Sequence, residues 1–167
     1  DMLRAEAPMT HRKDGENLDL KGEKPVAAGA LKAGNGWQEV KFDAPVKARF
    51  FCLEALNAQN GKDNAAIAEF YLLGENGKPL SRQHWQIAYA DSEETQWGNY
   101  TADKIFDLQE STFWNTAWGD KYPHQVVIDL REDVVISGFR YLPRAEEGYP
   151  GMIKEYKAYA KMSPFKF

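Results

Sequence analysis

Apolar and polar side chains alternate with a two-residue period in several short segments of this chain, a pattern typical of half-buried β-strands. Other short segments are apolar on both faces, as strands in the middle of a sheet are. Turn residues separate these segments, and no long stretch carries a helical period. This pattern predicts an all-β fold, an antiparallel sandwich or barrel. The predicted strands lie at residues 40–42, 49–56, 66–73, 126–130, 134–142 and 153–161.

Local turn signals predict how these strands connect. An Ala-Pro pair at residues 44–45 predicts a turn, and the acidic pair at residues 132–133 predicts a tight turn that makes residues 126–142 a hairpin. Between residues 92 and 120 the alternation gives way to a polar and aromatic loop with at most one helical turn, at residues 102–106. Long loops on β-scaffolds tend to carry function, so this loop is the first place to look for a site.

Composition excludes several classes of function. The chain has 167 residues, with 21 Lys and Arg against 25 Asp and Glu, so its net charge is −4. This balance lacks the positive surface that binds nucleic acid, and it gives no attraction to an anionic membrane. The single cysteine, Cys52, excludes an internal disulfide and is expected to fill the core. The sequence also lacks an apolar run of about 18 residues, which a membrane-spanning helix needs.

Catalytic motifs are missing as well. The chain contains no G-x-S-x-G, H-E-x-x-H, P-loop or G-x-G-x-x-G sequence. The acidic pairs at residues 93–94 and 146–147 are adjacent in sequence, and we expect them to be solvated loop charges and not a catalytic dyad. The sequence therefore predicts a protein that is not an enzyme.

Aromatic residues gather in or beside the predicted loops, where burial in a strand does not require them. They are Trp97, Trp114, Trp118, Tyr122 and Tyr149. An exposed ring can stack on the apolar face of a sugar, while nearby Asn, Arg or Asp side chains bond the hydroxyls. Alternatively, a loop Trp folds back and plugs the end of the core. Trp114, beside Phe113, fits this second role best.

Oxygen-bearing residues cluster in the same loop. Asp107, Gln109 and Thr112 follow closely after Lys104, where side chains and main-chain carbonyls can turn toward one hard cation such as calcium. The same residues also suit ordinary turn and capping hydrogen bonds. Glu69 is a lone charge in an apolar strand, and an unpaired buried carboxylate is costly, so it needs a partner that a bound cation would supply.

Several runs of sequence resemble a known family. The runs are residues 89–95 (YADSEET), 102–118, 123–130 (PHQVVIDL) and 137–144 (SGFRYLPR). They resemble the first half of a discoidin domain, also called coagulation factor 5/8 type C, and are most similar to the family 32 carbohydrate-binding modules of bacterial glycoside hydrolases. Residues 40–50, 60–61 and 66–70 resemble the second half of the same domain.

The resemblance implies a galactose-binding-like jelly-roll sandwich with its halves in permuted order. Residues 25–79 resemble the family's C-terminal half and residues 80–161 its N-terminal half. Either residues 25–167 form one circularly permuted domain, or the chain holds unlike halves of neighbouring domains. We favour one permuted domain, because the halves add up to one set of strands and one core. Residues 1–24 are expected to form a lead-in segment or an edge strand.

The resemblance also implies a structural calcium ion. The family's metal loop provides main-chain carbonyls and side-chain oxygens, and a strand from the other half adds a carbonyl and a carboxylate. The corresponding positions are Lys104, Asp107, Gln109, Thr112, Ala68 and Glu69. We therefore favour calcium over simple hydrogen bonding here, because the ion also provides the partner that Glu69 needs.

The sugar-binding pattern of the family carries over less completely. The candidate ligand-binding residues are Trp97, Asn115, Trp118, Arg144 and Tyr149. Trp97 and Tyr149 are the best stacking candidates, and Arg144 and Asn115 are expected to bond hydroxyls. Asn115 stands where sugar-binding members often have His, and residues 148–152 lack the usual Asn, so the galactose pattern is incomplete. Arg144 has the alternative role of a structural salt bridge.

These features predict a non-catalytic carbohydrate-binding module that holds an attached glycoside hydrolase near its glycan. The permuted order is similar to the C-terminal domains of bacterial chitobiases, which implies a chitobiase or hexosaminidase as the parent enzyme. It also implies a secreted, periplasmic or cell-surface location in a bacterium, although the sequence shows no signal-peptide pattern. The alternative is a structural or protein-docking sandwich without its own glycan. Membrane lipid, a ligand of other discoidin-like domains, is disfavoured by the acidic charge.

Overall fold

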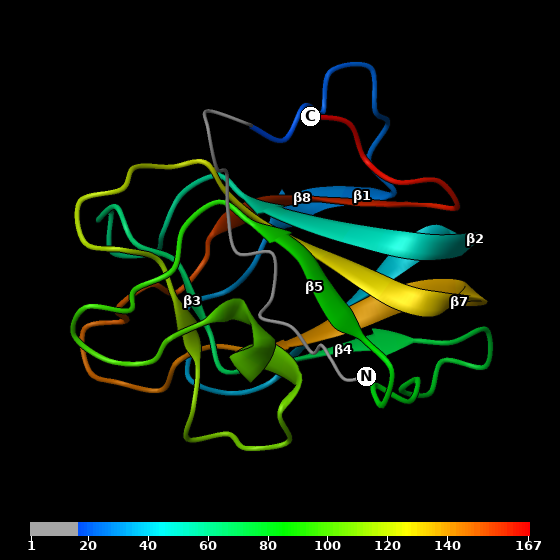
Figure 1. The fold of residues 1–167 in the computed structure, drawn as a ribbon. Coiled ribbons are helices and arrows are strands. Elements are labelled where there is room, and N and C mark those ends of the chain that lie inside the picture. Colours follow the sequence, from blue (N-terminus) through cyan, green and yellow to red (C-terminus); the bar gives the residue numbers. More distant parts are fainter. Residues whose placement is uncertain (1–16) are drawn as a thin grey trace.

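The computed structural model of the chain describes residues 17–167, and these residues form an antiparallel β-sandwich with one short 3₁₀ helix (Figure 1). The elements are β1 Ala27–Ala30, β2 Gln38–Ala55, β3 Ala66–Ile67, β4 Glu69–Leu73, β5 Gln86–Ala90, η2 Ala102–Phe106, β6 Trp114–Asn115, β7 His124–Leu142 and β8 Glu155–Lys161. No helix among the described residues is long and apolar enough to cross a bilayer. The all-β prediction is confirmed.

Two long strands, β2 and β7, run antiparallel to each other through the molecule (Figure 1). Residues 50–55 of β2 pair with residues 124–129 of β7, and residues 38–48 pair with residues 134–141. On one side of the molecule β8 and β5 flank this pair, with β1 beyond β8, and on the other side β4 flanks it. The long strands therefore contribute to both layers of the sandwich.

The core lies between the two layers. Phe51 of β2 packs against Phe70 of β4 and Phe139 of β7, with ring centroids 5.5 and 6.3 Å apart. Trp114 is buried at one end of this core, and its indole N–H donates to the Ser92 carbonyl at 2.9 Å. The predicted plug is therefore present. Side chains from both halves of the sequence pack in this one cluster.

Cys52 belongs to a smaller buried cluster on the outer face of the same sheet. It is fully buried, and its neighbours in this cluster include Phe50, Tyr89 and Val127. Burial raises the pKa of the Cys52 thiol well above its ordinary value, because the thiolate would lose its hydration. Cys52 is thus a neutral core residue, as the sequence predicts.

Both predicted turns inside the long strands are wrong. Residues 44–45 lie within β2 and residues 132–133 lie within β7, and the two segments expected to form a hairpin each pair with β2 instead. The residues that predicted turns lie instead at or near irregularities in continuous strands. The register shifts between Lys41 and Val46, and Arg131 adopts a φ of 64°. Such irregularities bend a strand without ending it, which lets β2 and β7 pass from one layer to the other.

The other predicted elements are confirmed, with small shifts in their bounds. The segment at residues 66–73 is divided into β3 and β4, residues 153–161 contain β8, and the helical turn is η2. The edge strand β1 was not predicted, because its Ala and Gly residues carry no alternation.

The proposed lead-in segment, residues 1–24, is only partly described. Residues 1–16 lie outside the described part of the chain. Within the remainder, Asp19 forms an isolated antiparallel bridge with Lys166, so this segment lies beside the C-terminal residues.

The close contact between β2 and β7 leads to a test of the fold. A Cβ atom added at Gly138 would lie 2.3 Å from the Val40 carbonyl oxygen. Gly138→Ala is expected to destabilise the protein by about 1–3 kcal/mol, because backbone must move to make room. Gly36→Ala is the control, since nothing lies within 4 Å of its added Cβ. Equal midpoints of urea unfolding for the two variants would contradict this packing.

Candidate functional site

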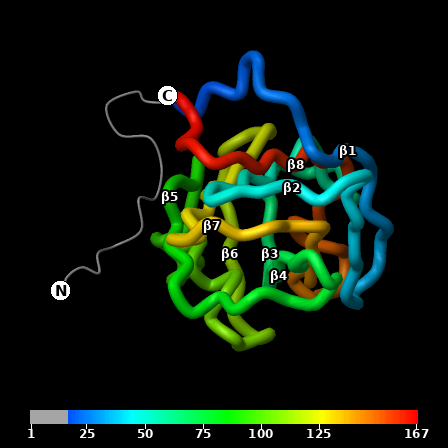
Figure 2. Tube along the Cα trace, turned by 90° about the vertical axis from the view of Figure 1, so that its right-hand side faces the viewer, coloured from blue at the N-terminus to red at the C-terminus, as the bar shows by residue number. Residues whose placement is uncertain are grey.

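Loops from both halves of the sequence meet at one end of the sandwich. Residues 91–123 connect β5 to β7 and contain η2 and β6, and residues 56–65 connect β2 to β3. The short strands β3 and β6 pair, with Asn115 opposite Ala66, and lie side by side in Figure 2. This pairing holds the two loops together.

A cavity of about 630 Å³ opens between these loops, within the size range of small-molecule sites. Four of the five candidate ligand residues line it, namely Trp97, Asn115, Trp118 and Arg144. Trp97 and Trp118 leave 74% and 90% of their surfaces exposed. Tyr149 does not line the cavity, although its neighbour Pro150 does. The structure thus brings together two exposed indoles and two polar side chains from the predicted set.

Glu94 joins the two loops that carry the exposed indoles. Its Oε2 accepts the backbone N–H groups of Gln96 and Trp97, both at 2.9 Å, and its Oε1 accepts that of Trp118 at 3.0 Å. These backbone donors, led by Trp97, hold the pKa of Glu94 below its ordinary value. One carboxylate therefore fixes the backbone beneath both rings.

The expectation that residues 93–94 are solvated loop charges is wrong. Glu93 and Glu94 leave only 9% and 7% of their surfaces exposed. The Glu93 carboxylate accepts the backbone N–H of Ala102 at 2.7 Å, while burial raises its pKa. The loop backbone turns its N–H groups inward, where they have no strand partner, and the two carboxylates satisfy them. The pair is structural.

Arg144 is held in place from three directions at the cavity wall. Its guanidinium lies over the Phe113 ring, 4.4 Å from the centroid, and pairs with Glu146 at 2.6 Å. It also donates to the Asn115 side-chain oxygen at 3.3 Å, which in addition accepts the Asn64 amide at 3.2 Å. Arg144 therefore forms a salt bridge and also lines the cavity, so the two roles expected as alternatives occur together. Fixed donors and acceptors of this kind suit a ligand rich in hydroxyl groups.

The sequence missed the contribution of the loop at residues 56–65. Asn60, Lys62, Asp63 and Asn64 all line the cavity. In the sequence this segment reads as a polar turn, and its place in the site depends on the pairing of β3 with β6. The Asn-Gly pair at residues 60–61 was part of the family resemblance, and this was the one signal that pointed to it.

The predicted metal loop is compact. Asp107 accepts the Gln109 backbone N–H at 3.0 Å and is hydrogen-bonded to the Thr112 hydroxyl. That hydroxyl also lies 3.1 Å from the Gln109 carbonyl. Lys104 lies in η2 at the start of the loop, and its ammonium lies 3.7 Å from Asp103. Within residues 17–167, no three His, Cys, Asp or Glu side chains are placed to hold a metal, so a cation here would depend on carbonyl and hydroxyl oxygens too.

Glu69 lies next to this loop and is almost fully buried. Its Oε1 pairs with Arg82 at 2.7 Å, whereas its Oε2 has no hydrogen-bond partner among the described residues. Burial, together with the nearby Asp107 carboxylate, raises the pKa of Glu69 to about 7 despite Arg82. An unpaired buried carboxylate oxygen beside a second carboxylate fits a cation. The neighbouring Ala68 donates its N–H to Leu142 at 2.9 Å.

Comparison with known proteins agrees with this geometry. Residues 88–165 match the family model described as the F5/8 type C domain. This part of the chain is therefore similar to an F5/8 type C, or discoidin, domain. This discoidin segment contains the proposed metal loop and all four of the cavity residues predicted from the sequence. F5/8 type C domains are typically non-catalytic modules, and the sandwich described above is of their galactose-binding-like type.

About half of the chain is also similar to part of a larger protein. A sialidase from Micromonospora viridifaciens is 32% identical over 88 residues, which are 50% of this chain and 13% of the sialidase. The chain thus matches only a small part of that relative. The likeness is consistent with a carbohydrate-binding module.

The role of Glu94 leads to a test that needs no ligand. Glu94→Ala is expected to speed amide hydrogen exchange at Gln96, Trp97 and Trp118 together, because one acceptor serves all three groups. Exchange is measured residue by residue by NMR. Glu147→Ala, at an exposed loop position, is the matched control. Faster exchange in only one of the two loops would contradict the shared anchor.

Proposed function

We propose that this chain is a non-catalytic module that binds a glycan in the cavity between Trp97 and Trp118. The observation that carries the proposal is the combination of two exposed indoles with a fixed polar wall around a cavity of about 630 Å³. A sugar ring has an apolar C–H face and a rim of hydroxyls, so it matches both kinds of surface. Tyr149, outside the cavity lining, is not included in the proposed contact set.

The exposed rings support this proposal energetically. Large exposed apolar surfaces are rare on monomeric proteins unless they contact something. Glu94 fixes the backbone at both Trp97 and Trp118, so little backbone freedom is lost when a ligand stacks on their rings. The rings are therefore prepared for a partner that covers them.

The polar wall supports hydroxyl recognition. Arg144 keeps its position through Phe113 and Glu146, and it orients the Asn115 amide. Asn64 reaches the same Asn115 oxygen from the other loop. Preorganised donors and acceptors bind a polyol without paying to order long side chains.

A module of this kind acts by keeping an attached enzyme close to its substrate. Tethered to a glycoside hydrolase, it raises the effective concentration of the glycan near the catalytic domain without doing chemistry itself. The likeness to part of a sialidase supports a parent enzyme that acts on glycans, and a chitobiase or hexosaminidase is the parent that we propose. Such an enzyme would work in a secreted, periplasmic or cell-surface setting of a bacterium.

We also propose a structural calcium ion at the loop that starts at Lys104. The support is the unpaired Glu69 oxygen, the adjacent Asp107 carboxylate and the oxygens of Gln109 and Thr112. Calcium prefers six to eight oxygen ligands, and main-chain carbonyls of Lys104 and Ala68 would complete such a set. The ion would tie β4 to the loop and supply no chemistry to the sugar site.

Titration calorimetry with a panel of mono- and oligosaccharides, including N-acetylglucosamine and galactose, tests the glycan proposal. Trp97→Ala and Trp118→Ala are each expected to weaken binding by about tenfold or more, because a stacking surface is lost. Trp37→Ala is the matched control, since this exposed Trp does not line the cavity and lies at a different pocket. No heat from any sugar would overturn the proposal in favour of a structural or protein-docking role.

Thermal unfolding tests the calcium proposal. Excess calcium is expected to raise the melting temperature of the parent by about 5–10 °C, because a ligand that binds only the folded state stabilises it. Asp107→Asn should abolish this response, whereas Asp43→Asn, on an exposed part of β2, should keep it. A parent melting curve that is the same in calcium and in chelator would leave Asp107 and Glu69 with hydrogen bonding alone.

A further inference from the structure

His124 is a buried titratable group that lies directly behind the proposed glycan cavity. It is the first residue of β7, and its surface is 0% exposed. Its Nδ1 lies 2.8 Å from the Asp91 carboxylate, and its Nε2 lies 2.7 Å from the Asp63 carbonyl oxygen. Both ring nitrogens therefore face oxygen acceptors.

Two acceptors require two ring protons. A neutral imidazole carries one N–H, so its second nitrogen would place a lone pair against either Asp91 or the Asp63 carbonyl. Only the imidazolium donates to both. The His124 ring has no exposed surface, and an acceptor that loses its donor is destabilised, which ties the charge state of His124 to the position of Asp63.

The Asp63 carbonyl belongs to the rim of the cavity. Asp63 and Asn64 both line it, and the Tyr122 hydroxyl donates to the Asn64 carbonyl at 2.8 Å. The Tyr122 ring packs against His124 with centroids 4.5 Å apart. The rim is thus attached to the start of β7 through two neighbouring side chains. Asn64 in turn reaches Asn115 on the polar wall.

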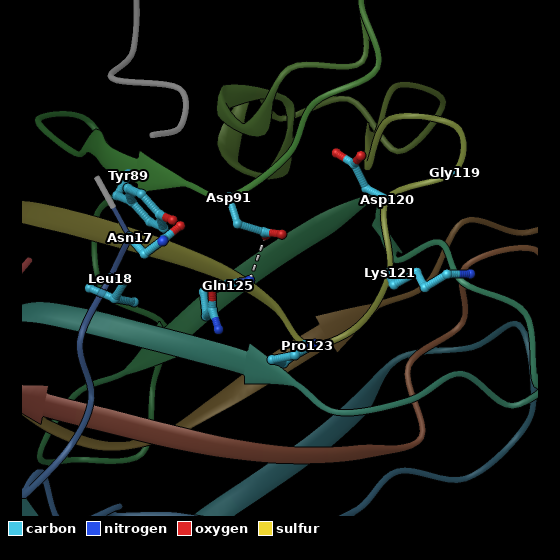
Figure 3. A pocket seen from close by; sticks show the side chains of 9 residues that line it. All are labelled: Asn17, Leu18, Tyr89, Asp91, Gly119, Asp120, Lys121, Pro123 and Gln125. Atoms are coloured by element: carbon cyan, nitrogen blue, oxygen red, sulfur yellow. Dashed lines mark hydrogen bonds between the residues drawn. The ribbon is translucent and has the colours of Figure 1, made fainter. Parts of the chain in front are cut away.

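A second pocket, of about 360 Å³, lies beside Asp91, the carboxylate that contacts His124 (Figure 3). Asp91 lines it together with Asp120, Lys121 and Gln125, and in Figure 3 its carboxylate accepts the Gln125 backbone N–H, at 2.7 Å. The Asp91 carboxylate therefore touches the pocket and His124 at once.

We propose that His124 is a positioning residue whose imidazolium holds the Asp63–Asn64 rim in place, so that the rim loosens and glycan binding weakens when the ring loses its proton. The second part of this inference rests on the proposed glycan-binding function. The ring acts through the Asp63 carbonyl and does not touch the ligand.

The charged groups around His124 set the direction of the pH dependence. Burial opposes the charged ring, but the hydrogen bond and charge of Asp91, the Asp63 carbonyl and the more distant Asp120 together raise the pKa of His124 above its ordinary value of 6.5. Tyr122 stays neutral because burial raises its pKa, and Lys121 is paired with the Asp63 carboxylate at 3.1 Å. Since the folded pKa is raised, the stabilisation is complete below 6.5 and is lost as pH rises through the folded pKa.

NMR titration of the full chain tests the positioning role without any ligand. His124 is expected to carry both ring protons at low pH and to lose one with a midpoint above 6.5, the ordinary value for histidine. The Asp63 and Asn64 amides should then shift with the same midpoint as the ring. His84→Gln, a change at an exposed histidine, is the control and should leave the behaviour of these two amides unchanged. A His124 midpoint at or below 6.5, or a titration that leaves the rim amides unmoved, would overturn the inference.

Calorimetry across the same pH range tests the consequence for binding. The affinity for a sugar that binds at low pH should fall by roughly threefold to tenfold through the His124 midpoint, the effect of losing one hydrogen bond. Asp91→Asn should move that midpoint to lower pH, and His84→Gln should change nothing. An affinity that stays constant through the midpoint would refute the coupling. If no sugar binds at any pH, the proposed function fails, and the NMR titration alone still decides the role of His124.

Discussion

The pairing of β2 with β7 is the interaction on which the rest of the structure depends. Because both strands continue through their bulges, each contributes to both layers, and the two halves of the sequence are joined by backbone hydrogen bonds. The same arrangement places the loop after β2 beside the loop before β7. The candidate site lies between these two loops, so its shape follows from the course of two strands.

Anchoring of the loop backbone is the second level of organisation. At this end of the molecule there is little regular structure, and buried carboxylates take the place of strand partners. Glu94 accepts backbone N–H groups from the loops of Trp97 and Trp118, and Glu93 accepts one at the start of η2. Asp91 accepts a backbone N–H of β7 and contacts the His124 ring. These acids explain how a segment with few strands holds in place the backbone that carries the two exposed indoles.

The sequence predicted the fold class, most strands, the buried roles of Cys52 and Trp114, and four of the residues that line the cavity. The alternation of apolar and polar residues and the family resemblance were sufficient for these predictions, because both are visible in short runs of sequence. The hairpin at residues 126–142 was wrong, since a local turn signal cannot distinguish a chain reversal from a bulge whose strand keeps its partner. The acids at residues 93–94 and the rim at residues 60–64 were missed because their roles depend on distant backbone groups. The permuted order and the calcium site stay predictions.

The cavity between the two exposed indoles is the proposed glycan site. The most direct measurement is NMR mapping of the chain during titration with chito- and galacto-oligosaccharides. We expect the indole signals of Trp97 and Trp118 and the side-chain amides of Asn64 and Asn115 to shift together and saturate. Shifts centred instead on the exposed Trp37 and Tyr71 face, or no shifts with any oligosaccharide, would contradict it.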